Sequence, residues 1–380
     1  MQTNGFADKI PHMHIGIDCR LPYYQMGGIS QYVLHLLPAL AALDQENQYT
    51  LFHSRKDGRS YLPSAPNFRR ANLWTPCHHR VERWALSAEL LPHRLDVLHS
   101  PDFIPPQRGG KRQIITVHDL NFIYYPQFLT PESLRYYADQ IEWAVHVADR
   151  ISADSHATRS DLIEKLNVPP EKVTTIHLAV NPLYQRDYAA ADIHKTLKQH
   201  NLPQGFILFV GTLEPRKNVP TLIKAYRQLR QETPVDAPLV LVGGKGWIYD
   251  EIFATIDALG LQEHVRHLSG VFDQQLAHLY HAAGVLVTPS HYEGFGLPAL
   301  EAMNCGCPVV VSNRGSLPEI VGPNGVMIDD PDDAAAWADI LRRVLTDAAL
   351  REVMARNGRS HAATFSWEKA ARQTLDLYAE

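Results

Sequence analysis

Two glutamates separated by seven residues occur in the segment TPSHYEGFGLPALEAMNCGCPVVV, which begins at residue 288. Glu293 lies in a glycine-bearing loop after one apolar run, and Glu301 lies in the helix expected before a second apolar run. A strand, a glycine loop and a helix N-terminus form an anion site, because unpaired backbone N–H groups and the helix dipole point to one place. Two carboxylates beside such a site would repel a phosphate unless they bind hydroxyl groups. Each glutamate alone could be a plain solvated residue of a helix or loop. Together with Gly294, Gly296 and Pro298, the two glutamates favour a nucleotide-sugar site, with sugar hydroxyls on Glu293 and Glu301.

A pair of adjacent cations, Arg216 and Lys217, occurs in the segment GTLEPRKNVPTLIKAYR, between an expected strand and an expected helix. An Arg fork and a compact Lys charge at the end of a parallel strand suit a diphosphate. Adjacent basic residues in a loop are also often simply solvated, but the nearby glutamate segment favours the diphosphate interpretation. A Gly-Gly turn at Gly27 and Gly28 predicts either a second phosphate-facing loop or a plain turn that requires positive φ.

The candidate site residues must be positioned by the elements around them. Short apolar runs alternate with helical or irregular segments through the whole chain. A first series covers residues 14–21, 49–55, 95–100, 112–120, 150–155 and 172–180, and a second series covers residues 206–211, 238–244, 265–270, 284–289, 307–313 and 325–329. Strands that alternate with helices call for a parallel sheet with both faces covered. The expected fold class is α/β, with two doubly wound parallel-sheet domains.

The length of 380 residues exceeds what a single core normally supports, so two domains are expected. The polar stretch after residue 182 contains proline and glycine and is the best candidate for a linker. The expected organisation is a flexible leader at 1–12, a first domain at 13–182, a linker region at 183–204, a second domain at 205–364 and a final helix at 365–380.

The composition excludes several classes of protein. A formal net charge of −5 argues against a nucleic-acid binder. Four cysteines are too few for a disulfide scaffold, and the chain shows neither a signal-peptide pattern nor a long apolar window, so a cytoplasmic location is expected. No His and Cys spacing indicates a metal site, and no cofactor is expected. The helix expected at 78–93 mixes Arg with Trp and Leu, so it either contacts a membrane surface peripherally or packs on its own domain.

Four motifs occur in a fixed order along the chain. They are the Gly27–Gly28 turn, the pair His118 and Asp119 after a strand, EPRKN at 214–218 and EGFGLPALE at 293–301. In this order they resemble the retaining glycosyltransferases of family 4, also called glycosyltransferase group 1, which have the GT-B fold. The resemblance implies two Rossmann-like domains that face each other across a cleft, with the last helix crossing back to the first domain.

The resemblance also implies roles for individual residues. Arg216 and Lys217 would hold the donor diphosphate, Glu293 would lie against the donor hexose, and His118 would contact the donor sugar. The implied catalytic residues are Arg216, Lys217, Glu293 and His118, and the implied donor-binding residues are Gly27, Gly28, Gly211, Phe295, Gly296, Leu297 and Glu301. Glu301 would take the ribose hydroxyls, and Gly28 would close over the phosphate from the opposite domain.

The expected activity is transfer of a hexose from a nucleotide sugar to a hydroxyl of a glycan or lipid-linked acceptor, with retention and without a metal. The GTLEPRKN segment and the overall length most resemble bacterial mannosyltransferases of polysaccharide assembly, so GDP-mannose is the first donor to test. Three alternatives stay open: a UDP-sugar donor, a phosphorolytic or sugar-phosphate-forming enzyme of the same fold, and a non-catalytic nucleotide-sugar sensor. The residues also leave the linkage and the oligomeric state open.

Overall fold

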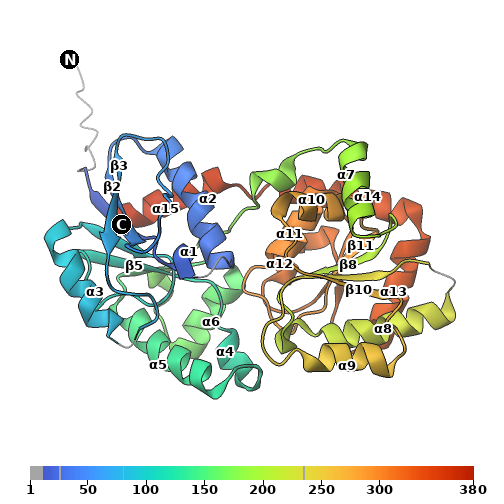
Figure 1. The fold of residues 1–380 in the computed structure, drawn as a ribbon. Helices are drawn as coiled ribbons and strands as arrows, with labels where there is room; N and C mark the ends of the chain where they lie inside the picture. The colour runs from blue at the N-terminus through green and yellow to red at the C-terminus, as the bar shows by residue number, and fades with distance from the viewer. Residues whose placement is uncertain (1–11, 25–26, 80, 234–235) are drawn as a thin grey trace, which may run out of the picture.

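The computed structural model describes residues 12–24, 27–79, 81–233 and 236–380, and it contains two α/β units side by side (Figure 1). The predicted leader therefore lies outside the described residues, apart from residue 12.

Among the described residues, the first sheet has seven strands, namely β1 (His14–Asp18), β2 (Gln48–Ser54), β3 (Phe68–Leu73), β4 (Val97–Ser100), β5 (Arg112–Val117), β6 (Arg150–Ala153) and β7 (Val173–Thr175). All pairings are parallel, in the order β3-β2-β1-β4-β5-β6-β7. Its helices are α1 (Leu21–Tyr24), α2 (Gly28–Leu43), α3 (Glu82–Leu90), α4 (Asn121–Tyr124), α5 (Pro131–Val147) and α6 (His156–Leu166).

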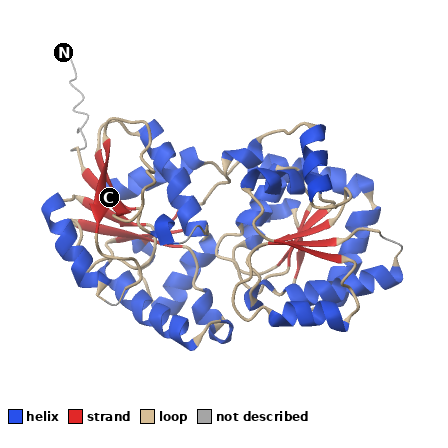
Figure 2. Cartoon of the chain, viewed as in Figure 1, coloured by secondary structure: helices blue, strands red, loops and turns tan. Residues whose placement is uncertain are grey.

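The second sheet has six strands within the described part of the chain: β8 (Ile207–Val210), β9 (Leu239–Val242), β10 (Val265–Leu268), β11 (Val285–Thr288), β12 (Val309–Ser312) and β13 (Val326–Ile328). They are parallel, in the order β10-β9-β8-β11-β12-β13. Its helices are α8 (Val219–Glu232), α9 (Asp250–Ala258), α10 (Asp273–Ala282), α11 (Leu297–Asn304), α12 (Leu317–Val321), α13 (Ala334–Thr346) and α14 (Ala348–Ala362). Helices cover both faces of each sheet (Figure 2), so the predicted fold class is confirmed.

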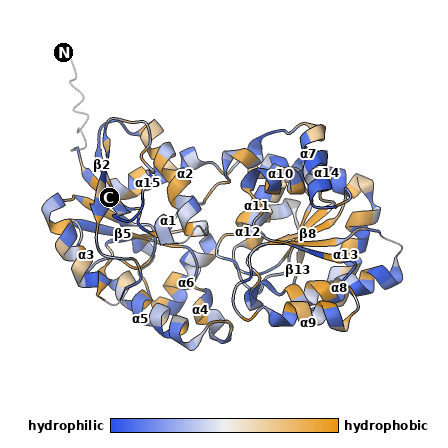
Figure 3. Ribbon diagram, in the orientation of Figure 1, coloured by the Kyte–Doolittle hydropathy of each residue, from blue (hydrophilic) through white to orange (hydrophobic). Residues whose placement is uncertain are grey.

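Strands β9 and β11 of the second sheet are apolar on both faces, which explains why they lie inside the sheet and not at its edges. All four residues of β9 (LVLV) and all four of β11 (VLVT) are buried. Burial of a Val or Leu side chain contributes about 1.5–3 kcal/mol, so these short runs hold their place between two helix layers. Figure 3 shows the same arrangement, with hydrophobic strands inside and mixed helix surfaces outside.

Residues 183–204, the predicted linker, contain a helix of their own. This helix, α7 (Ala190–Gln199), packs against α10 of the second unit, and Thr196 Oγ1 lies 2.7 Å from His278 Nδ1. The domain boundaries drawn from composition stay a prediction.

The last helix, α15 (Trp367–Ala379), returns to the first unit, as predicted. Ser366 caps its N-terminus by accepting a hydrogen bond from the Lys369 backbone N–H at 3.1 Å. The helix packs against α2, and the Tyr378 hydroxyl hydrogen-bonds with His99 Nδ1 at 2.7 Å. The C-terminus accordingly lies beside the first sheet (Figure 1). No helix in the described ranges combines the length and apolar content that crossing a bilayer requires.

Each sheet reverses its strand order once, between β1 and β4 in the first and between β8 and β11 in the second. In open parallel sheets, ligands bind beyond the carboxyl ends of the strands at such a switch point. A cleft of about 480 Å³ is lined by residues from both units, including Asp102 and His118 of the first and Arg216 and Glu293 of the second. The topology therefore directs the site to the junction of the two sheets.

Candidate active site

A cluster of two cations and two carboxylates lies at the second unit's wall of the cleft, and all but Glu214 line it. Lys217 Nζ donates to both carboxylate oxygens of Glu293, at 2.6 and 2.9 Å, and Arg216 Nη1 donates to Glu293 Oε2 at 3.0 Å. Arg216 Nε also pairs with Glu214 Oε1 at 2.6 Å. The loops that carry these groups follow β8 and β11, which are neighbours in the sheet. Arg216, Lys217 and Glu293 therefore converge on one place, as the sequence predicts.

The electrostatics of this cluster keep Glu293 and Arg216 charged. Burial alone would raise the pKa of Glu293, but Lys217 and Arg216 hold it at about 2. Burial lowers the pKa of Arg216, yet Glu293 and Glu214 raise it more, so the guanidinium stays charged. Burial and the Arg216 charge lower the pKa of Lys217. In the absence of a ligand, each cation is thus stabilised by a carboxylate that an anion could replace.

Helix α11 presents its N-terminus to the same cleft. Gly296 is the N-cap residue with φ of +91°, and it supplies no side-chain cap to the first turn. A side chain there would be strained, and its Cβ would lie 2.8 Å from Leu317 Cδ2, so this turn requires glycine. Phe295, Gly296 and Leu297 all line the cleft, as does Gly211 at the end of β8. Backbone N–H groups at this helix end are suited to an anion.

His118 follows β5 and lines the cleft, but both of its ring nitrogens are occupied. Nδ1 donates to Asp154 Oδ2 at 2.6 Å, and Nε2 donates to the Pro101 carbonyl at 2.8 Å. Burial would lower the pKa of His118, yet Asp154 raises it to about 9, so the imidazolium form dominates at neutral pH. A hydrogen bond from this ring to a donor sugar would therefore have to replace one of these two bonds.

The partner of His118 was not predicted from the sequence. Asp154 lies just past β6, which pairs with β5 in the sheet. Residues at the carboxyl ends of neighbouring parallel strands lie close together. The positions of His118 and Asp154 at two such strand ends could therefore have indicated the pair.

Glu301 lies apart from the cluster. It is half-buried on α11, it accepts a hydrogen bond from the Tyr280 hydroxyl at 2.8 Å, and it is not among the residues that line the 480 Å³ cleft. Burial raises the pKa of Glu301 to about 7, so near neutral pH it carries a partial charge only. The structure therefore does not bring Glu301 into the cleft that Glu293 lines. The role of Glu301 at a ribose stays a prediction.

The Gly27–Gly28 turn lies on the first unit. Gly28 is the first residue of α2 and lines the cleft, whereas Gly27 is the N-cap, with φ of −125°, and does not line it. Neither glycine has positive φ, so the explanation as a turn that requires positive φ is wrong. A Cβ on Gly28 would meet nothing within 4 Å, which leaves open space above this backbone. Close approach of a ligand remains the explanation for glycine at this position.

Contacts between the units surround the cleft. A Cβ on Gly294 would lie 2.1 Å from the His118 carbonyl oxygen, so the glutamate loop passes directly against the first unit. The carboxylate of Glu319 on α12 accepts hydrogen bonds from the backbone N–H groups of His156 and Ala157 at 2.9 and 3.2 Å, and from His177 Nε2 at 2.9 Å. Glu319 thereby caps helix α6 of the opposite unit, a role that the sequence analysis missed. In the part of the chain that the structure describes, no three His, Cys, Asp or Glu side chains gather to hold a metal ion.

Comparisons with known proteins show the family of this chain. The family described as Glycosyltransferase Family 4 matches residues 26–182, and the family described as Glycosyl transferases group 1 matches residues 192–361. The O-antigen chain mannosyltransferase B of Escherichia coli is 33% identical over 378 residues, which cover 93% of this chain and 96% of that protein.

Two solved structures show the same architecture. The sucrose-phosphate synthase of Thermosynechococcus elongatus has a TM-score of 0.76 at 25% identity, covering 97% of this chain and 98% of that one. HepE of Anabaena, in complex with UDP and glucose, has a TM-score of 0.75 at 20% identity, covering 96% and 99%, and shows the fold alone. The chain belongs to the glycosyltransferases of family 4 (group 1), with two Rossmann-like sheets in the GT-B arrangement.

Proposed function

We propose that this glycosyltransferase moves a hexose from a nucleotide sugar to a hydroxyl acceptor with retention of configuration. The observation that carries the proposal is the cluster of Arg216, Lys217 and Glu293 in the cleft, beside the N-terminus of α11. A diphosphate matches two cations and a row of helix-end N–H groups, and a carboxylate next to it suits the hydroxyls of the attached sugar.

The cluster would act mainly on the leaving group. As the bond between the sugar and the diphosphate breaks, negative charge grows on the phosphate oxygen, and Arg216 and Lys217 stabilise that charge in a site with little water. The diphosphate replaces Glu293 as the partner of these cations, and Glu293 then accepts hydrogen bonds from the hexose. The acceptor oxygen forms its bond on the face that the diphosphate leaves, and its proton passes to the departing phosphate oxygen.

Mannose from GDP-mannose is the first donor we propose. The full-length relative from Escherichia coli is named as an O-antigen chain mannosyltransferase, which also supports a glycan or lipid-linked acceptor. A UDP-sugar is the alternative that the HepE complex with UDP and glucose supports. The name of the sucrose-phosphate synthase supports a third, transfer that forms a sugar phosphate.

We also propose that the reaction is independent of metal ions and other cofactors, because Arg216 and Lys217 together supply the positive charge that the diphosphate requires. Rates measured after EDTA treatment and dialysis should equal the untreated rates. A loss of activity that Mg²⁺ or Mn²⁺ restores would overturn metal independence.

A peripheral membrane contact is proposed for the outer face of α3. Leu86 and Leu90 of this helix pack into the core of the first unit, so the helix does pack on its own domain. Trp84 and Leu91 are 61% and 78% exposed on the other side, as an interfacial anchor requires. Co-sedimentation with anionic vesicles should fall for Trp84→Ala with Leu91→Ala. Equal binding by this variant and the wild type, or no binding by either, would refute the contact.

The cytoplasmic location expected from the cysteine content stays a prediction.

A panel of nucleotide sugars tests the proposed function. Release of nucleoside diphosphate should occur with one donor in the presence of a glycoside acceptor, and NMR of the product should show the anomeric configuration of the donor. Turnover only with free phosphate or with a sugar-phosphate acceptor would favour the phosphorolytic or sugar-phosphate-forming alternative. Tight donor binding without transfer or slow hydrolysis would favour a sensor.

A further inference from the structure

A second polar site faces the cation cluster from the first unit's wall of the cleft. His78 and Asp102 both line the cleft, and they also line a small cavity of about 20 Å³ beneath its wall. Asp102 lies two residues past β4, at the switch point of the first sheet. The motifs that identify the family do not include either residue. Each switch point thus supplies one set of polar groups to the cleft. The proposed donor site uses the set from the second sheet and leaves His78 and Asp102 of the first unit unassigned.

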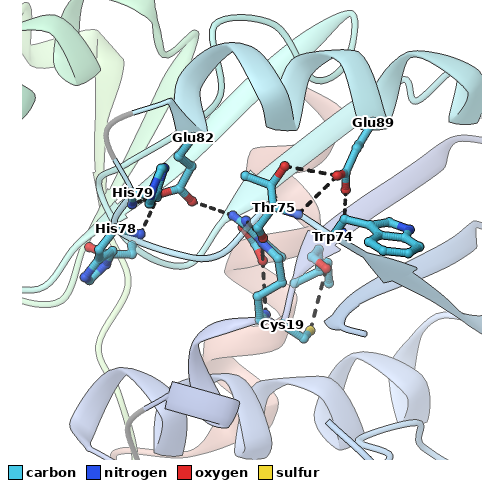
Figure 4. Close-up of polar contacts among 11 residues, drawn as sticks. Cys19, Trp74, Thr75, His78, His79, Glu82 and Glu89 are labelled. Atoms are coloured by element: carbon cyan, nitrogen blue, oxygen red, sulfur yellow. Dashed lines mark hydrogen bonds and ion pairs between the residues drawn. The ribbon is translucent and has the colours of Figure 1, made fainter. Parts of the chain in front are cut away.

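His78 has an unusual backbone that is fixed by its surroundings. Its φ is +58°, a left-handed conformation that non-glycine residues rarely adopt and that costs about 1–3 kcal/mol. The backbone N–H of His78 donates to Glu82 Oε2 at 2.6 Å, as Figure 4 shows. Its ring Nε2 donates to Asp102 Oδ2 at 2.9 Å. The loop is thus held so that the imidazole stands at the wall of the cleft.

A buried ion network supports this loop from below. Arg20 is 1% exposed, and its Nη2 pairs with Asp18 Oδ2 and with Glu82 Oε1, both at 2.6 Å. Arg20 Nη1 also donates to the Thr75 carbonyl at 2.8 Å. Burying an Arg with two carboxylates contributes little net stability, but it fixes geometry. Glu82 thereby links the end of β1, through Arg20, to the backbone of His78.

The hydrogen-bonding capacity of His78 and Asp102 is not exhausted within the protein. Among the described residues, nothing hydrogen-bonds to Nδ1 of His78, in contrast to the fully occupied ring of His118. Burial lowers the pKa of His78, but the hydrogen bond and charge of Asp102 raise it more. The side chains of His78 and Asp102 are 35% and 18% exposed, so both can reach a ligand.

An aromatic cluster adjoins the pair, in which Phe103 and Phe122 are buried and Tyr137 is partly exposed. Phe103, Phe122 and Tyr137 pack on one another with ring centroids 5.8–5.9 Å apart, and all three line the cleft. A wall that is mostly apolar, with a few fixed polar groups, is typical of small-molecule sites. A pyranose fits this chemistry, because one ring face offers C–H groups and its edge offers hydroxyls.

We propose that His78 and Asp102 bind hydroxyl groups of the acceptor's terminal pyranose, whose ring face packs at the partly exposed Tyr137. This inference rests on the proposed glycosyl transfer and names the acceptor side of the same cleft. His78 donates to an acceptor oxygen, Asp102 accepts from a neighbouring hydroxyl, and the pair holds the attacking oxygen toward the donor. Glu82 and Arg20 are positioning residues, since they act through the backbone of His78.

Two variants test the assignment without disturbing the backbone. Asn tolerates the left-handed region, so His78→Asn removes the imidazole while keeping φ near +58°. Asp102→Asn keeps an oxygen for the Phe103 backbone N–H, which Asp102 Oδ1 accepts at 2.7 Å. His79→Asn is the matched control, because His79 is exposed, adjoins His78 and does not line the cleft.

The assay compares glycosyl transfer with donor hydrolysis by water. The probes are GDP-mannose and UDP-glucose as donors and methyl α-glycosides of mannose, glucose, galactose and N-acetylglucosamine as acceptors. Both variants should lose about ten- to hundredfold in kcat/KM for the acceptor, chiefly through KM. Their donor KM, their hydrolysis rate and all constants of His79→Asn should stay within about twofold of the wild type.

An unchanged acceptor KM, or an equal loss of hydrolysis and transfer, would overturn the assignment. If the wild type turns over no nucleotide sugar, the proposed function fails, and acceptor binding is then read directly by saturation-transfer NMR with the same glycosides. Weaker binding by His78→Asn than by the wild type supports the acceptor site. Equal binding, or no binding by the wild type, contradicts it.

Discussion

Replacing Lys217 is the most informative perturbation of the cluster. Lys217 Nζ lies 2.6 and 2.9 Å from the two oxygens of Glu293, in a position to bind the diphosphate instead. Loss of one charge-assisted bond to a leaving group costs about 3 kcal/mol in the transition state. Since about 1.4 kcal/mol is a factor of ten, kcat/KM for Lys217→Ala should fall by at least about a hundredfold. Arg216→Ala should show a loss of similar size.

The same substitution also leaves Glu293 buried with one cation fewer, which costs about 3 kcal/mol of stability. The double variant Lys217→Ala with Glu293→Gln removes that unpaired charge. Its Tm should therefore recover relative to Lys217→Ala, while its kcat/KM should remain low. This pattern separates the loss of contacts within the site from general destabilisation.

The assay measures initial rates of nucleoside diphosphate release, together with thermal unfolding of each variant. Lys224→Ala is the control, because Lys224 is an exposed cation on the adjoining helix α8. It should match the wild type in both measurements. Near-wild-type transfer by Lys217→Ala and by Arg216→Ala would refute the assignment of this loop to the diphosphate.

Three further predictions concern the junction of the two units. Gly294→Ala would place a Cβ 2.1 Å from the His118 carbonyl oxygen, so the transfer rate should drop at least tenfold. Circular dichroism should show that each sheet stays folded, and an unchanged transfer rate would contradict the close approach. Glu319→Ala should lower the Tm by several degrees, since it removes three hydrogen bonds to a carboxylate, and a Tm equal to that of the wild type would show that this cap is unimportant. The pKa of His118 rises from 6.5 to about 9, so its pairing with Asp154 contributes about 3 kcal/mol, fully present below pH 6.5 and lost as the pH rises through about 9. Thermal unfolding between pH 6 and 9.5 should show this decline in the wild type but not in Asp154→Asn, and parallel curves would contradict it.

The strands that the sequence could predict are those with short apolar runs, and several of them are buried on both faces. Runs such as LVLV in β9 have no other stable place than the centre of a covered parallel sheet. The edge strand β3 (FRRANL) was not predicted, because only its first and last residues are buried and it carries two arginines. Helix α7 was assigned to a linker because it is short and polar, with only Thr196 and Leu197 buried.

The predictable part of the site follows the same logic. Arg216 and Glu293 follow neighbouring strands, so topology alone brings their loops together. The spacing of Glu293 and Glu301 fixes their separation along the chain, but not which side of α11 faces the cleft. Pairings over a long sequence separation were missed, including that of Glu82 with Arg20 and that of Glu319 with the N-terminus of α6. These partners come from surface loops and helices whose positions depend on the assembled fold.

The central claim is that the cations of the second unit hold the diphosphate of a sugar donor in the cleft. A crystal structure of the chain with bound GDP-mannose tests it most directly. We predict diphosphate oxygens within hydrogen-bond distance of Arg216 and Lys217, with Glu293 turned toward the hexose. A donor bound elsewhere, with Lys217 still paired to Glu293, would contradict the account.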